Sequence, residues 1–204
     1  MSVSLQKGQK ISLTKAGSVG LKKIMVGLGW DEAQPQAKGF FGLFASKPAD
    51  IDCDASAILC GANGKTIGGT KESVVYFGNL RHSSGAVIHQ GDNLTGAGEG
   101  DDEQIMVDLS IVPSNVEKIV FVVNIYDASA RHQDFGMIRN AFIRVVDMRS
   151  NSEICKYNLS EDYSGKTGLI VGEIYRHEGE WKFNAIGQGV ANASRLDSLI
   201  NLYR

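Results

Sequence analysis

The sequence predicts an all-β protein, an antiparallel β-sandwich with a short C-terminal helix. Three observations support this fold class. Most apolar runs are short and rich in β-branched residues. Turn dipeptides such as Asn63-Gly64 and Ser84-Gly85 separate these runs, and helical windows are few. With 204 residues, of which 43% are hydrophobic, the chain is long enough to bury a core.

Strand patterns recur along the whole chain. Within residues 104–112, Ile105, Val107 and Leu109 share one face of a strand, as the period of two requires. Many such runs separated by turns favour two packed antiparallel sheets. The segments predicted as strands are, in chain order, 22–30, 53–60, 73–77, 104–112, 117–127, 141–148, 168–176 and 180–187.

Two segments depart from the strand pattern. In the tail, residues 196, 199, 200 and 203 are apolar at helical spacing and predict a short amphipathic helix. Residues 33–50 contain proline and glycine and are expected to form an inserted loop. Its apolar stretch Phe40–Phe44 either folds back over the core or forms an exposed contact for a partner or a membrane.

Composition restricts the functional class. We expect a single domain over residues 1–204, because no repeat or low-complexity linker divides the chain. A net charge of −2 gives no basic surface for nucleic acid. No run is long enough for a membrane span, and the N-terminus lacks the apolar core of a signal peptide. Three cysteines without CxxC spacing fit reduced thiols. A cytoplasmic location is therefore expected.

The acidic segment, residues 91–103 (GDNLTGAGEGDDE), crowds carboxylates among glycines. Close pairs of like charges cost about 1 kcal/mol in bulk water and roughly 4 kcal/mol near a protein surface. A folded chain tolerates this crowding if the segment stays solvated, if some groups are protonated, or if a cation binds. Calcium takes oxygen ligands of the kinds present here, including the amide of Asn93 and the hydroxyl of Thr95. The segment contains no histidine or cysteine, which disfavours zinc and copper.

Three aspartates elsewhere carry matching chemistry. Asp52 and Asp54 stand two apart at a predicted strand start, so both side chains point to one side. Asp31 lies at a predicted strand end. If these strand ends meet the acidic segment, they form a cage at one edge of a sheet, with enough charge for two calcium ions or for partial participation. The alternatives are a solvated acidic loop and, less favoured, a phosphate-binding loop. The segment is not an EF-hand, since Leu94 occupies its third position.

Several stretches resemble the TerD family of bacterial tellurium-resistance and stress proteins. They include VGLGWD, DCDAS, GDNLTGAGEGDDE and GEWKFNAIGQG, and the resemblance extends over roughly residues 3–189. It implies a calcium-binding β-sandwich without established catalytic activity, acting as a sensor or scaffold with other proteins of a resistance complex. The metal-associated residues that it implies are Asp31, Asp52, Asp54, Asp92, Asn93, Thr95, Glu99, Asp101, Asp102 and Glu103.

The chain departs from the family pattern at three places. Cys53 replaces a leucine between the two aspartates, but it faces away from them. The 33–50 loop is longer than in the shortest members, and the helical tail 190–204 diverges. Two alternatives stay open: a calcium-gated module that contacts a membrane or partner through Phe40–Phe44, and a tellurite-processing enzyme that uses Cys53 or Cys60. Those two cysteines lie seven apart in one strand, so they face opposite sides and are expected to be structural.

Overall fold

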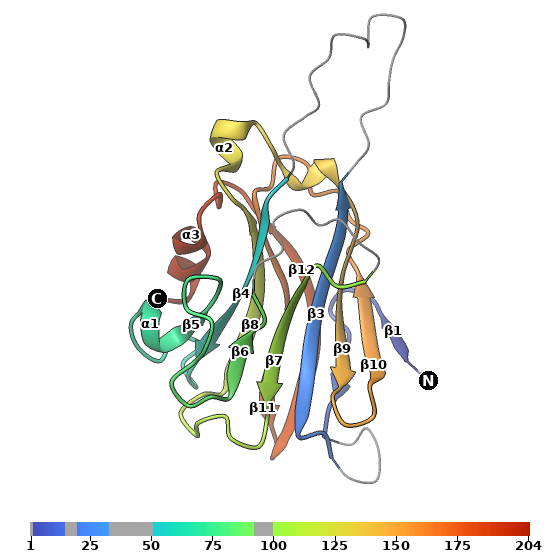
Figure 1. The fold of residues 1–204 in the computed structure, drawn as a ribbon, viewed down its shortest axis with the longest axis vertical. Coiled ribbons are helices and arrows are strands. Elements are labelled where there is room, and N and C mark those ends of the chain that lie inside the picture. The colour runs from blue at the N-terminus through green and yellow to red at the C-terminus, as the bar shows by residue number, and fades with distance from the viewer. Residues whose placement is uncertain (1, 15–19, 33–50, 92–99) are drawn as a thin grey trace, which may run out of the picture.

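A computed structural model shows the fold and describes residues 2–14, 20–32, 51–91 and 100–204 (Figure 1). Two six-stranded sheets pack against each other. In spatial order, sheet A contains β1 (Val3–Leu5), β10 (Ser152–Asn158), β9 (Ile138–Asp147), β3 (Lys23–Glu32), β7 (Glu103–Asp108) and β6 (Val87–His89). Sheet B contains β2 (Lys10–Ser12), β12 (Glu180–Val190), β11 (Gly168–His177), β8 (Lys118–Ile125), β4 (Cys53–Cys60) and β5 (Val74–Val75).

Helices are short in the described residues. The α-helices are α1 (Thr70–Ser73), α2 (Ala128–Arg131) and α3 (Leu196–Ile200), and the 3-10 turns are η2 (Phe135–Met137) and η3 (Asn201–Tyr203). The predicted C-terminal helix is thus confirmed as α3 with its continuation η3. No helix in the described part of the chain has the length and apolar character needed to cross a bilayer.

The predicted β-sandwich is confirmed, with one difference in strand direction. Every strand pair is antiparallel except β1 and β10, which run parallel, so sheet A is mixed. Strand β10 was not predicted, because its sequence SEICKYN mixes charged and apolar residues. β7 ends at Asp108, earlier than predicted, because the chain turns at Ser110, whose N–H donates to Asp108 Oδ1 at 3.1 Å.

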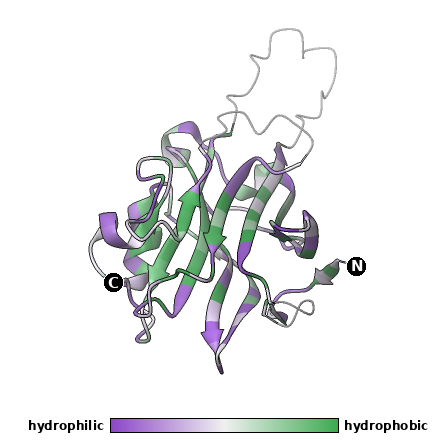
Figure 2. Cartoon of the chain, turned by 60° about the horizontal axis from the view of Figure 1, so that its bottom comes forward, coloured by the Kyte–Doolittle hydropathy of each residue, from purple (hydrophilic) through white to green (hydrophobic). Residues whose placement is uncertain are grey.

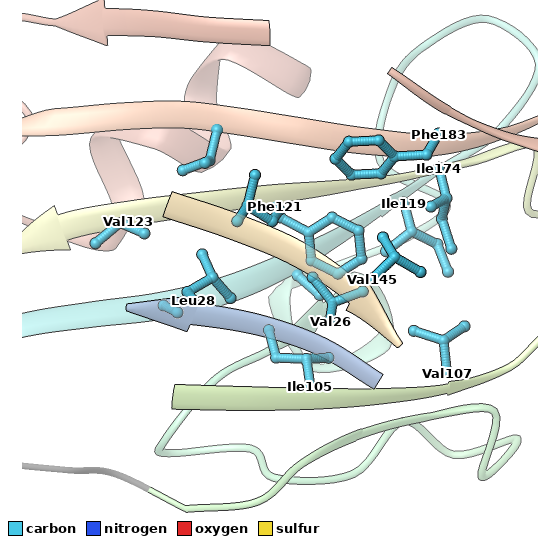
Figure 3. Close-up of a cluster of buried hydrophobic side chains, with 14 of the residues drawn as sticks. Val26, Leu28, Ile105, Val107, Ile119, Phe121, Val123, Val145, Ile174 and Phe183 are labelled. Atoms are coloured by element: carbon cyan, nitrogen blue, oxygen red, sulfur yellow. The ribbon is translucent and has the colours of Figure 1, made fainter. Parts of the chain in front are cut away.

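The main core lies between the sheets. Strands contribute alternate side chains to it, as β7 does with Ile105 and Val107 (Figure 3). Phe121 of β8 and Phe183 of β12 are its largest fully buried side chains. Colouring by hydropathy shows apolar residues concentrated along the strands of the sandwich (Figure 2). Both tryptophans, Trp30 and Trp181, belong to this core, as the sequence predicted.

A second apolar cluster lies on the other face of sheet B. There Ile58 of β4 and Val120 of β8 pack with Leu199 and Ile200 of α3. Strand β4 is therefore buried on both faces, and all eight of its residues are buried. Leu199 and Ile200 are two of the four residues whose spacing predicted the tail helix.

The three cysteines, Cys53, Cys60 and Cys155, are buried. Cys53 belongs to the core between the sheets and Cys60 to the second cluster, which confirms that they face opposite sides. Burial raises the pKa of Cys60 to about 11 and that of Cys155 to about 12. Because the thiolate is the reactive form, these two side chains are poor nucleophiles near neutral pH.

Candidate metal centre

Six of the ten candidate ligands lie in the described residues: Asp31, Asp52, Asp54, Asp101, Asp102 and Glu103. The other four, Asp92, Asn93, Thr95 and Glu99, lie outside the described residues, as does the loop 33–50 with Phe40–Phe44. The three consecutive acids Asp101, Asp102 and Glu103 have different environments, although they are neighbours in the sequence.

Asp101 is held by an arginine on the outer face of sheet A. Arg144 of β9 donates from Nε to Oδ1 at 2.7 Å and from Nη2 to Oδ2 at 2.9 Å. Gln104 Nε2 donates to Oδ2 at 3.1 Å. The Asp101 side chain is 0% exposed. Its hydrogen bonds to Arg144 raise the pKa of that guanidinium above its ordinary value. The negative charge of Asp101 is therefore already balanced within the protein by the positive charge of Arg144.

Asp102 lies near the end of β3, beside the acids Asp31 and Asp101. Its N–H donates to the carbonyl oxygen of Leu28 at 2.8 Å, and its Oδ2 accepts from the N–H of Trp30 at 2.7 Å. Burial raises the pKa of Asp102; the Trp30 hydrogen bond opposes this, and the charges of Asp31 and Asp101 add to it. The ionised form thus carries an electrostatic penalty that a cation would relieve.

Asp31 is positioned by an irregularity between β3 and β9. The register of the two strands shifts between Gly29 and Asp31. Asn140 of β9 has a left-handed backbone with φ 53°, and its Nδ2 donates to Asp31 Oδ2 at 2.8 Å. Bulges of this kind commonly redirect side chains at functional sites.

Glu103 connects the two sheets. Its Oε2 accepts from the N–H of Ala55 in β4 at 2.6 Å and lies 3.4 Å from His89 Nε2. The His89 Nε2 also lies 3.2 Å from the carbonyl oxygen of Ala55. The N–H of Gly91 donates to His89 Nδ1 at 3.1 Å, which places the proton of a neutral ring on Nε2. Glu103 is 1% exposed and Asp102 is 9% exposed, so Glu103 is the more deeply buried of the two.

Asp52 and Asp54 lie at the start of β4. Cys53 and Ala55 point into the core, so Asp54 points to the opposite face of sheet B, as predicted. Opposite Asp54 in β8, Asn124 donates from Nδ2 to Asp54 Oδ2 at 3.4 Å. Asn124 is 2% exposed, and its amide oxygen Oδ1 has no hydrogen-bond donor. Asp52 Oδ2 lies 3.7 Å from Arg131 Nη1.

Four of the six described acids thus fall into two groups. Asp31 and Asp102 lie near the end of β3, and Asp52 and Asp54 lie at the start of β4, where Asp54 is beside Asn124 of β8. Among the residues that the structure describes, no three histidine, cysteine, aspartate or glutamate side chains come together in a way that could hold a metal ion. Each group offers only oxygen atoms, the donors that calcium prefers. Neither group suits zinc, which prefers nitrogen and sulfur.

A cavity of about 880 Å³ adjoins Asp31 at the start of β9. Its lining combines aromatic side chains, such as Trp30 and Phe142, with charged ones, such as Arg139 and Lys156. The ring of Phe142 lies against Gly29, where a Cβ would be 2.5 Å from Cε1 of the ring. Lys156 Nζ lies 3.7 Å from the centroid of the same ring.

Sequence reasoning missed two residues of this region, Arg144 and Asn124. Each is a single polar residue inside an apolar strand run, Arg144 in AFIRVVD and Asn124 in FVVNIYD. A polar side chain at such a position requires a partner when it is buried. This signal was present in the sequence, but the partner could not be identified before the strands were placed side by side.

Comparison with known proteins places this geometry in context. The model of the TerD domain matches residues 1–203. Stress response protein SCP2 of Bacillus subtilis (strain 168) is 54% identical over 203 residues, covering 100% of both chains. Tellurium resistance protein TerD of Serratia marcescens is 47% identical over 191 residues, covering 94% of this chain and 92% of the relative. Proteins named TerX and TerZ from the same organism are also similar.

A solved structure shares the fold. The crystal structure of a homologue of telluride resistance protein TerD from Streptomyces coelicolor A3(2) matches with a TM-score of 0.61 and 21% identity, covering 85% of this chain and 92% of that one. At this identity the match shows the fold alone.

Proposed function

Because the chain belongs to the TerD domain family, we propose that it is a calcium-binding protein of a tellurite-resistance and stress-response system. In this proposal it acts as a calcium-dependent sensor or scaffold and has no catalytic activity. Membership of the family supports the stress-related role, and the arrangement of oxygen atoms in the described residues supports the choice of ion.

The observation that carries the calcium proposal is the amide oxygen of Asn124. A buried polar atom without a hydrogen-bond partner costs about 1–3 kcal/mol. Asn124 Oδ1 is such an atom, and the Asn124 side chain lies beside the carboxylate of Asp54. A calcium ion there would bind the amide oxygen and the carboxylate together, and both are ligands that calcium uses. Asp52 is the next candidate at this position.

The second group supports a second ion. Asp31 and Asp102 are close enough for the charge of Asp31 to raise the pKa of Asp102. A divalent cation between them would remove this repulsion. Asp92, Asn93, Thr95 and Glu99 stay candidates for either ion, since they lie outside the described residues. Bound calcium would supply a positive charge that fixes the acidic segment relative to the end of β3 and the start of β4.

A non-catalytic role is supported by the state of the thiols. A tellurite-reducing enzyme needs accessible thiolates, whereas Cys53, Cys60 and Cys155 are all buried. Partners within a resistance system are supported by the three similar Ter proteins of one organism. We therefore propose that the protein works together with related TerD-domain proteins.

Calorimetric titration of the EDTA-treated protein with Ca²⁺ tests the proposal. We expect binding, and about a tenfold loss of affinity in Asn124→Leu and in Asp54→Asn, because each change removes a ligand atom. Asn184→Leu is the matched control: Asn184 Oδ1 also has no donor and its Nδ2 donates to Glu173 at 3.0 Å, but Lys118 already lies 3.4 Å from that carboxylate. The absence of any binding heat in the wild type, or an unchanged affinity in Asn124→Leu, would reject the proposal.

A further inference from the structure

We propose that Arg144 is an internal counter-cation of Asp101, and that Asp101 positions its neighbour Asp102 instead of binding calcium. The inference rests on the proposed calcium function, but the contacts that lead to it are independent of any metal. In this proposal Asp101 has a positioning role, whereas its neighbour Asp102 binds the calcium ion.

The acceptor capacity of Asp101 is the first argument. An ionised carboxylate has about four lone-pair sites in total. In Asp101, Oδ2 already accepts from Arg144 Nη2 and Gln104 Nε2, and Oδ1 accepts from Arg144 Nε. The side chain is 0% exposed. A calcium ion would have to compete for these oxygens with a guanidinium that never loses its charge.

The second argument is that sheet A contains a space for this carboxylate over Gly27, between Arg144 and Gln104, which we call the seat. Gly27 of β3 pairs with Arg144 of β9 on one side and with Gln104 of β7 on the other, so the three residues form one row across three strands. The Asp101 carboxylate lies over the glycine of this row: a Cβ on Gly27 would be 2.3 Å from Asp101 Cγ. Arg144 and Gln104 then donate to it from both sides. Only glycine leaves this space without displacing Asp101.

The seat determines where Asp102 lies. Directly after Asp101, the N–H of Asp102 donates to the carbonyl oxygen of Leu28, and the Trp30 N–H donates back to the Asp102 carboxylate. Fixing Asp101 over Gly27 therefore fixes the next carboxylate at the end of β3. Arg144 acts on the cation site through Asp101, which makes it a positioning residue.

Arg144→Lys tests the proposal because it keeps the charge but loses the two-pronged geometry. In EDTA-treated protein titrated with Ca²⁺, we expect Arg144→Lys to weaken calcium affinity about threefold or more, because Asp102 is held less firmly. Asp101→Asn should weaken it as well. The double variant should be no weaker than the weaker of the two single variants, since both changes disrupt the same seat. Glu173→Gln, which breaks the Lys118–Glu173 pair on sheet B, should leave calcium affinity unchanged.

Direct calcium binding by Asp101 would give a different set of affinities in these variants. If Asp101 were a ligand, Arg144→Lys would leave calcium affinity unchanged or raise it, and Asp101→Asn would cost its full factor in both backgrounds; this outcome overturns the proposal. If the wild type does not bind calcium, the proposed function fails, but the seat is still tested by thermal melts in EDTA. There, Asp101→Asn and Arg144→Lys should each lower the midpoint, and the double variant should melt no lower than the less stable single one. Additive losses would overturn the seat.

Discussion

The outer faces of the two sheets are built from opposite chemistry. On sheet B, α3 covers an apolar cluster that contains Ile58, Val120 and Leu199. On sheet A, the corresponding layer over the central strands is ionic, with Asp101 bound by Arg144 above Gly27. The apolar face gains stability from burial and makes few geometric demands. The ionic face depends on geometry, because each charge has to meet its partner.

The apolar and the ionic contacts should affect different properties of the protein, the first its stability and the second also its calcium binding. Apolar contacts under α3 contribute free energy of folding without being directed at the acidic residues. The contacts around Asp101 are directional and continue to Asp102, so they control where a charged side chain lies. Substitutions in the apolar cluster under α3 should therefore change stability alone, whereas substitutions around Asp101 should change stability and calcium binding together.

The largest expected effect is on the apolar face. Leu199→Ala removes a fully buried side chain that anchors α3 on sheet B, and it should lower the free energy of unfolding by about 2–5 kcal/mol. Urea denaturation measures this change. Calcium affinity of the folded variant should stay at the wild-type value. A stability loss accompanied by an equal loss of calcium affinity would contradict the separation of the two faces.

The same contrast explains what the sequence could predict. The helix α3 followed from the spacing of Leu196, Leu199 and Ile200, because burial of an apolar stripe depends on a local period. The strands β3, β4 and β8 followed from their apolar runs for the same reason. In contrast, the partner of Asp101 lies 43 residues away in sequence. Register between strands sets that pairing, and a single sequence carries no signal for it.

Long-range polar contacts limited the prediction of the site in the same way. The acidic character of residues 91–103 was evident, as was the matching chemistry of Asp31, Asp52 and Asp54 at predicted strand ends. Which oxygen atoms are already bound within the protein was not evident, because Ala55, Trp30 and Asn140 donate from distant strands. The parallel pairing of β1 with β10 escaped prediction too, since three residues carry too short a pattern.

The next effect concerns the seat on sheet A. In Gly27→Ala the added methyl group would overlap the Asp101 carboxylate, with a cost of about 1–3 kcal/mol from overpacking. Because β3 is paired on both sides, Asp101 is the group that moves, and calcium affinity should fall as well. Gly61→Ala, directly after the end of β4, is the control, since the nearest atom to its added methyl group would lie at 3.4 Å. Urea denaturation and calcium titration of both variants decide the point. Wild-type calcium affinity in Gly27→Ala would show that the seat does not affect binding.

A smaller effect depends on pH. The pKa of Asp102 is raised, so its contribution to stability is largest below the unfolded pKa and is lost as pH rises through the folded pKa. In EDTA, Asp102→Asn should therefore raise the thermal midpoint near neutral pH, and the gain should disappear toward about pH 4. The same variant should bind calcium more weakly, because it has lost a charged ligand.

The pKa of Asp147, at the end of β9, is shifted in the opposite direction to that of Asp102. Hydrogen bonds led by the Ser150 hydroxyl lower the pKa of Asp147, so its contribution is present above the unfolded pKa and is lost as pH falls through the folded one. Asp147→Asn should thus lower the midpoint near neutral pH and leave calcium affinity unchanged. Equal signs for the two variants in melts over this pH range would refute the opposite pKa shifts of Asp102 and Asp147.

The smallest effect compares one lysine on each sheet. Lys156 Nζ lies 3.7 Å from the centroid of Phe142 on sheet A, whereas Lys10 Nζ lies 5.9 Å from that of Tyr175 on sheet B. Cation–π attraction at exposed sites contributes about 0.5–1 kcal/mol and weakens with distance. Lys156→Met should therefore destabilise the protein by about 0.5–1 kcal/mol, and Lys10→Met by less, in urea denaturation at constant ionic strength. Because methionine keeps most of the apolar length of lysine, the difference between the variants isolates the ammonium group. A larger loss in Lys10→Met would show that closely held charges are not specific to the outer face of sheet A.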